Sequence, residues 1–102
     1  MRRFLPVRKL AELDDAYHLT QTGNSEVLAQ WLVMAVRNGY HPADERLDDF
    51  LMSIGRLKYI KPIYELMLGT PDYRERAESI FARARRTYHP QTRSVIDKML
   101  SR

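Results

Sequence analysis

The sequence contains no cysteine among its 102 residues. Disulfide bonds and thiolate zinc sites are therefore excluded, and a reducing, cytoplasmic compartment is the default expectation. No apolar run approaches the roughly 20 residues that a membrane-spanning helix needs. The basic first residues are not followed by the apolar stretch that a secretory signal carries. We therefore expect a cytoplasmic location and no membrane partner.

Glycine and proline are scarce, with 4 and 5 occurrences, and they stand where helices should end and begin. Each proline comes just before a stretch with helical periodicity, and each glycine comes just after one. This asymmetry is expected because proline lacks an N–H group and glycine accepts a left-handed backbone. The boundaries and the apolar spacing predict about six helices, at approximately 7–19, 25–38, 43–54, 62–68, 73–88 and 91–101.

No segment alternates apolar and polar residues over the length of a strand, so we predict no sheet. The predicted fold is all-α, a single helical domain over residues 1–102. Short connections favour antiparallel helical hairpins. We expect them to stack as a fragment of a HEAT/armadillo-like right-handed superhelix. Tyr17 is expected on one face with Leu10 and Leu13, and Trp31 and the other tyrosines have the spacing of core residues.

Complete catalytic constellations are also missing from the sequence. The three histidines are far apart and form no H-E-x-x-H pair, and no glycine-rich phosphate loop or G-x-S-x-G stretch is present. Neighbouring acidic residues such as Asp14 and Asp15 point in different directions on a helix, which makes them poor metal clamps. We therefore predict no catalytic residue, no metal site and no cofactor in this chain.

Positive charge is concentrated in the second half of the chain. Residues 1–51 contain 6 Lys/Arg and 8 Asp/Glu, whereas residues 52–102 contain 11 and 5. An anionic partner would favour the second half. Arg76, Arg83 and Arg86 fall on one side of a predicted helix, but nothing resembles a base-reading recognition helix. A solvated basic face is therefore favoured over a nucleic-acid interface.

The stretch "GRLKYIKPIYEL" (55–66) places three cations before Pro62, where a helix N-terminus would favour acids. Because proline disfavours a helical conformation in the preceding residue, we expect residues 56–61 to be extended. Arg56 and Lys58 would then point the same way and form a receptor for an anion such as a carboxylate. Alternatively, the cations are merely tolerated at a cost of about 0.3–1 kcal/mol each. Charge placement alone leaves both interpretations open.

Three stretches carry a family resemblance: "NSEVLAQW" (24–31), "GRLKYIKPIY" (55–64) and "YHPQT" (88–92). In this order and spacing they resemble the C-terminal helical domain of the leukotriene A-4 hydrolase/aminopeptidase family of zinc metallopeptidases. The similarity runs from about Leu10 to the end and covers the later part of that domain. It implies that Arg56 binds the carboxylate of the substrate, either a peptide C-terminus or a fatty-acid epoxide. Lys58 would assist, and the domain would form a wall of the substrate cleft.

The departures from the family pattern concern catalysis. The zinc-binding H-E-x-x-H and the amine-binding G-x-M-E-N stretch are both absent. We therefore expect this chain to cleave nothing alone, with the zinc held by the catalytic domain of a parent protein, its expected partner. Missing upstream helices would leave an apolar flank on the first two helices. The alternative function is a non-enzymatic helical module that binds an acidic partner or nucleic acid.

Overall fold

The computed structural model of this chain describes residues 6–101. Within that range the chain forms six α-helices and no strand, which confirms the predicted all-α fold. Short 3-10 helices, η1 (Leu19–Gln21) and η2 (His41–Ala43), precede the second and third of them. The α-helices are α1 (Val7–Tyr17), α2 (Ser25–Asn38), α3 (Asp44–Ser53), α4 (Leu57–Leu68), α5 (Pro71–Ala84) and α6 (Pro90–Leu100).

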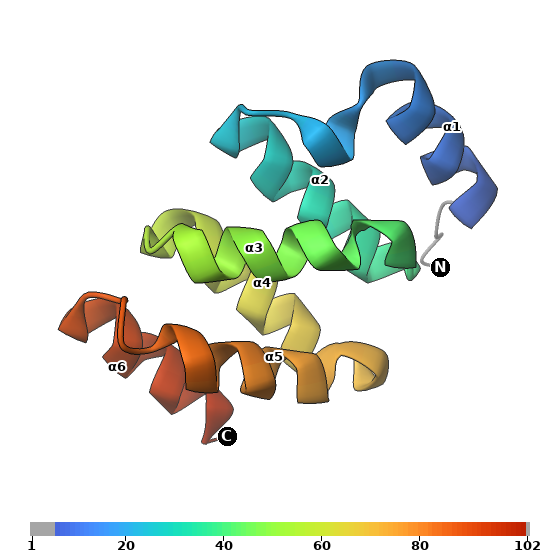
Figure 1. Ribbon diagram of the computed structural model, residues 1–102. Helices are drawn as coiled ribbons and strands as arrows, with labels where there is room; N and C mark the ends of the chain where they lie inside the picture. The colour runs from blue at the N-terminus through green and yellow to red at the C-terminus, as the bar shows by residue number, and fades with distance from the viewer. Residues whose placement is uncertain (1–5, 102) are drawn as a thin grey trace.

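The helices are arranged in two layers (Figure 1), with α3 and α5 in front of α2, α4 and α6. We expected successive helices to be the main neighbours, and α4 and α5 do pack in this way. The other close helix contacts join α2 to α4, α3 to α5 and α4 to α6. Helix α4 is therefore held from several sides, which fixes the position of its N-terminal residues. The right-handed superhelix stays a prediction.

Local signals explain the bounds of α2. The Asn24 side chain accepts a hydrogen bond of 3.1 Å from the Val27 N–H and caps the helix. At the other end Gly39 has a φ of 71°, in the left-handed region where a side chain would be strained. The predicted range of α2 and the observed one therefore coincide.

The tyrosines occupy two kinds of environment. Tyr64 and Tyr88 are buried, as expected, and their hydroxyls lie 3.0 Å apart while the Tyr88 hydroxyl also donates to the Leu51 carbonyl. Burial raises the pKa of Tyr64 and of Tyr88, so both hydroxyls stay neutral. The expectation that Tyr17 faces inward is wrong, because its side chain is 70% exposed. Leu10 is the buried residue of α1, and Tyr17 lies about two turns later, at the last residue of the helix, where its side chain is left largely uncovered.

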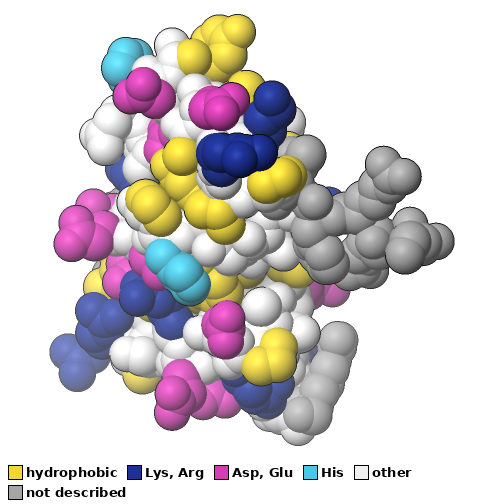
Figure 2. Space-filling view, turned by 90° about the vertical axis from the view of Figure 1, so that its right-hand side faces the viewer, with side chains coloured by type: hydrophobic (Ala, Val, Ile, Leu, Met, Phe, Trp, Pro, Cys, Tyr) yellow, Lys and Arg dark blue, Asp and Glu magenta, His cyan; other side chains and the backbone are white. Residues whose placement is uncertain are grey.

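The large hydrophobic side chains that the structure exposes between residues 6 and 101 all lie on α1 and α2. This is where the sequence predicted an apolar flank. Figure 2 looks onto the right-hand side of Figure 1 and shows hydrophobic side chains at the surface in the upper half, at the height of these helices. The exposed residues are Val7, Tyr17, Val27 and Met34.

A polar network joins α1 to the following segments. Asp14 accepts three hydrogen bonds, from the Thr20 N–H at 2.8 Å, the Thr20 hydroxyl at 2.7 Å and the Tyr40 hydroxyl at 2.8 Å. The Thr20 hydroxyl oxygen in turn accepts a hydrogen bond from the Trp31 indole N–H. Burial alone would raise the pKa of Asp14, but the hydrogen bonds from Thr20 and Tyr40 outweigh it and the pKa is lowered.

We predict that Asp14→Asn lowers the free energy of unfolding by about 1–3 kcal/mol near neutral pH, because the amide accepts fewer of these bonds. A lowered folded-state pKa stabilises the protein above the ordinary value of 3.8, and this stabilisation is lost as the pH falls from there through the folded pKa. The difference between variant and wild type should therefore shrink in acid. Urea unfolding at several pH values measures it. Asp15→Asn changes an exposed neighbour of the same charge and should leave the free energy of unfolding at neutral pH nearly unchanged.

Candidate functional site

Arg56 and Lys58 lie at the N-terminus of α4, which begins earlier than the sequence suggested. The expectation that residues 56–61 are extended is wrong: Arg56 is the N-cap with φ −77° and ψ 117°, and the helix runs from Leu57 with Pro62 inside it. Pro62 cannot donate to the carbonyl of Lys58 four residues back, which is a local cost. Burial of Ile60 and Ile63 on the inner face outweighs that cost, so the helix continues through the proline.

The two cations approach the same aromatic ring. The guanidinium carbon of Arg56 lies 5.8 Å from the centroid of the Tyr59 ring, and the ammonium of Lys58 lies 5.2 Å from it. Both distances allow attraction between a cation and the face of a ring. The structure therefore places Arg56 and Lys58 against the same aromatic ring, through the first turn of a helix rather than through a strand.

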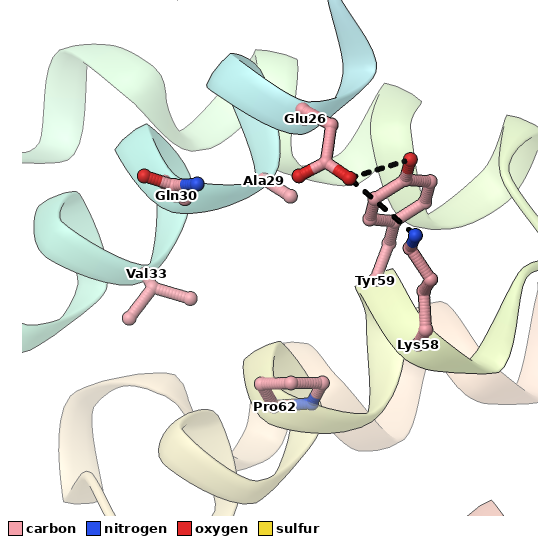
Figure 3. A pocket seen from close by; sticks show the side chains of 7 residues that line it. All are labelled: Glu26, Ala29, Gln30, Val33, Lys58, Tyr59 and Pro62. Atoms are coloured by element: carbon pink, nitrogen blue, oxygen red, sulfur yellow. Dashed lines mark hydrogen bonds and ion pairs between the residues drawn. The ribbon is translucent and has the colours of Figure 1, made fainter.

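Sequence reasoning missed the acidic residue of this spot, Glu26 in the first turn of α2. Its Oε1 lies 3.4 Å from the Nζ of Lys58 and accepts a hydrogen bond of 3.3 Å from the Tyr59 hydroxyl (Figure 3). Arg56, by contrast, forms no ion pair with any residue of the described range 6–101. The first turn of α4 has no acid of its own, so the contact between α2 and α4 supplies one. The lack of an acidic residue in the first turn of α4 was the sequence feature that could have indicated a partner from another helix.

A groove of about 260 Å³ lies between α2 and α4 beside these residues. Figure 3 shows Glu26, Lys58 and Tyr59 together at one end, and Val33 farther along α2. Ala29, Val33 and Pro62 make most of its remaining surface apolar. The groove therefore combines a charged end, formed by the Glu26–Lys58 pair, with an apolar surface that suits an uncharged group. The lining residues are Glu26, Ala29, Gln30, Val33, Lys58, Tyr59 and Pro62.

The residues described by the structure offer no metal site. Nowhere between residues 6 and 101 do three or more His, Cys, Asp or Glu side chains gather closely enough to hold an ion. His41 contacts Asp44 at 3.0 Å, and His89 accepts a hydrogen bond from the Gln91 N–H at the start of α6. These are local contacts at helix starts. A catalytic zinc ion therefore does not fit this part of the chain.

Several arginines of the basic half are paired with acids. Arg76 lies 2.8 Å from Asp48 and 3.7 Å from Asp44, and Arg85 lies 3.4 Å from Asp97. The acids reduce the positive charge that the face of α5 can offer to phosphates.

None of the helices in the described range is both long and apolar enough to cross a bilayer.

The sequence of this chain is similar to those of known proteins. The family model "Leukotriene A4 hydrolase, C-terminal" matches residues 2–100. Leukotriene A-4 hydrolase of Xenopus laevis is 27% identical over 96 residues, which is 94% of this chain and 16% of that protein. Leucine aminopeptidase 2-1 of Scheffersomyces stipitis is 34% identical over 99 residues, 93% of this chain and 15% of that protein. The chain thus spans about 15% of the length of these relatives.

Proposed function

The chain belongs to the leukotriene A4 hydrolase C-terminal family, and we propose that it forms one wall of the substrate cleft of an aminopeptidase. In this proposal residues 1–102 are a single helical domain, corresponding to the later part of the family's C-terminal domain. Arg56 binds the carboxylate of a peptide substrate, and Lys58 assists it. The catalytic zinc belongs to another domain, which is the partner of this one.

The convergence of Arg56 and Lys58 on the Tyr59 ring is the observation that carries this proposal. Arg56 is exposed and has no acidic partner in the described range, so its guanidinium is available for two parallel hydrogen bonds to a carboxylate. The free N–H groups at the start of α4 add to the favourable potential for an anion. The groove beside them supplies a surface along which the rest of a ligand can lie.

The contribution of this site to a reaction is positioning. A carboxylate held at Arg56 fixes one end of the substrate, so the scissile bond at the other end is presented to the catalytic domain in a limited set of orientations. Orientation of this kind lowers the entropic part of the barrier without any bond being made or broken at Arg56. The site therefore acts on the reaction through the geometry of the bound substrate.

Titration of the 102-residue chain with acetyl-Ala-Ala-Leu and with its C-terminal amide, followed by two-dimensional NMR, tests the anchor. We expect the acid to bind about two- to fivefold more tightly than the amide, which is the range for an exposed ion pair. Shifted signals should centre on Arg56 to Tyr59, and Arg56→Ala should remove the preference. Equal binding of acid and amide by the wild-type chain would contradict the proposal.

A further inference from the structure

Glu26 carries a negative charge into the site proposed for a carboxylate, and anchoring alone does not explain its presence. Its Oε1 lies 3.4 Å from the Lys58 Nζ and 3.3 Å from the Tyr59 hydroxyl. Arg56 has no such acid nearby in the described part of the chain. The site therefore holds two cations, of which one is already compensated, and the charge left over is that of a single cation.

The contact between Glu26 and Lys58 is open to exchange. Their side chains are 57% and 62% exposed, so water can solvate either partner once they separate. Exposed ion pairs of this kind contribute little to stability. A ligand carboxylate can therefore replace Glu26 at Lys58 at small cost, while Glu26 keeps the Tyr59 hydroxyl as a partner.

The rest of the groove holds no second cation to compensate a second negative charge. Beyond the charged end its lining residues are Ala29, Val33 and Pro62, whose side chains cannot bind an anion, and Gln30, whose amide is neutral. A second carboxylate on the ligand would lose solvation there and would lie near Glu26, which repels it. An apolar side chain in the same place would cover apolar surface instead.

We propose that Glu26 sets the charge selectivity of this site. The groove accepts a peptide end that has one carboxylate and an apolar terminal side chain, and Glu26 disfavours a terminal Asp or Glu. The inference rests on the proposed function of Arg56 as the carboxylate anchor. It adds a class of ligand and a residue, Glu26, that determines it.

Two peptides that differ only in the last side chain test this selectivity on the 102-residue chain. Titrations followed by NMR should show acetyl-Ala-Ala-Leu binding about two- to fivefold more tightly than acetyl-Ala-Ala-Glu. Glu26→Gln should bring this ratio toward one, because the repulsion is removed. Lys58→Gln should widen the ratio, because Glu26 then stands uncompensated. The two variants thus shift one quantity in opposite directions.

Glu12→Gln is the matched control. Glu12 forms an exposed pair with Lys9 at 3.7 Å, with side chains 60% and 63% exposed. Glu12→Gln therefore changes the net charge by the same amount as Glu26→Gln, at a residue that does not line the groove. Its ratio should equal that of the wild type. An unchanged ratio in Glu26→Gln would overturn the inference, even where Arg56→Ala abolishes the preference for the acid over the amide. Equal binding of acid and amide by wild type and Glu26→Gln would overturn the anchor itself, and the selectivity with it.

Discussion

Under the proposed function, replacing Arg56 with alanine in a polypeptide that carries this chain together with a catalytic domain is expected to lower kcat/KM for tripeptides by about 10- to 100-fold. The reason is the loss of charge-assisted hydrogen bonds to the substrate carboxylate, which hold the far end of the peptide in place. Zinc content should not change, since the described residues offer no metal site. Steady-state kinetics with a tripeptide and metal analysis of the same preparations measure both quantities.

Two comparisons make this prediction specific. Tripeptide amides have no carboxylate, so Arg56→Ala should leave their already lower kcat/KM nearly unchanged. Arg83→Ala removes another exposed arginine, whose Nε donates to the Ser79 carbonyl of its own helix, and should behave as wild type. Arg56→Lys keeps the charge but loses the paired donors, so an intermediate activity is expected. Wild-type activity of Arg56→Ala toward tripeptides would remove Arg56 from the site.

The bounds of most helices could be predicted from the sequence because local residues determine them. The Asn24 side chain accepts a hydrogen bond from a backbone N–H at the start of α2, and Gly39 adopts the left-handed conformation that ends the helix. Neither effect depends on the rest of the chain. The helix predicted at 73–88 is a counter-example, since α5 spans Pro71–Ala84, and Pro62 is another. Its local preference predicted a helix start, but the inner face of α4 buries Ile60 before the proline, and packing decides the outcome.

The site was only half predictable for a similar reason. Arg56 and Lys58 are close in sequence, so an unusual local concentration of charge was enough to single them out. Glu26 lies 33 positions before Tyr59 and accepts a hydrogen bond from its hydroxyl. The two residues meet because α2 packs on α4. Local sequence patterns relate residues within one helix, and they do not predict a contact between the first turn of α2 and the first turn of α4. Tertiary packing supplied that part of the site.

The largest loss of stability is expected for Tyr64→Ala, at about 3–5 kcal/mol, the range for removal of a large buried aromatic side chain. Tyr64 is completely buried in α4, meets the Phe81 ring edge to face at 6.2 Å and contacts the Tyr88 hydroxyl. Its removal leaves a cavity where α4 meets α5 and takes a partner from Tyr88. Urea unfolding followed by circular dichroism measures the change in the free energy of unfolding.

Tyr64→Phe separates the ring from the hydroxyl. The ring and its packing remain, and Tyr88 still donates to the Leu51 carbonyl, so the expected loss is about 0.5–1.5 kcal/mol. Tyr17→Ala removes the same side chain from an exposed position on α1 and should change stability by less than about 0.5 kcal/mol. Equal losses for the two Tyr64 variants would mean that the hydroxyl pair, rather than the packed ring, holds α4 in place. The position of Arg56 at the start of that helix would then depend on one hydrogen bond instead of on the core.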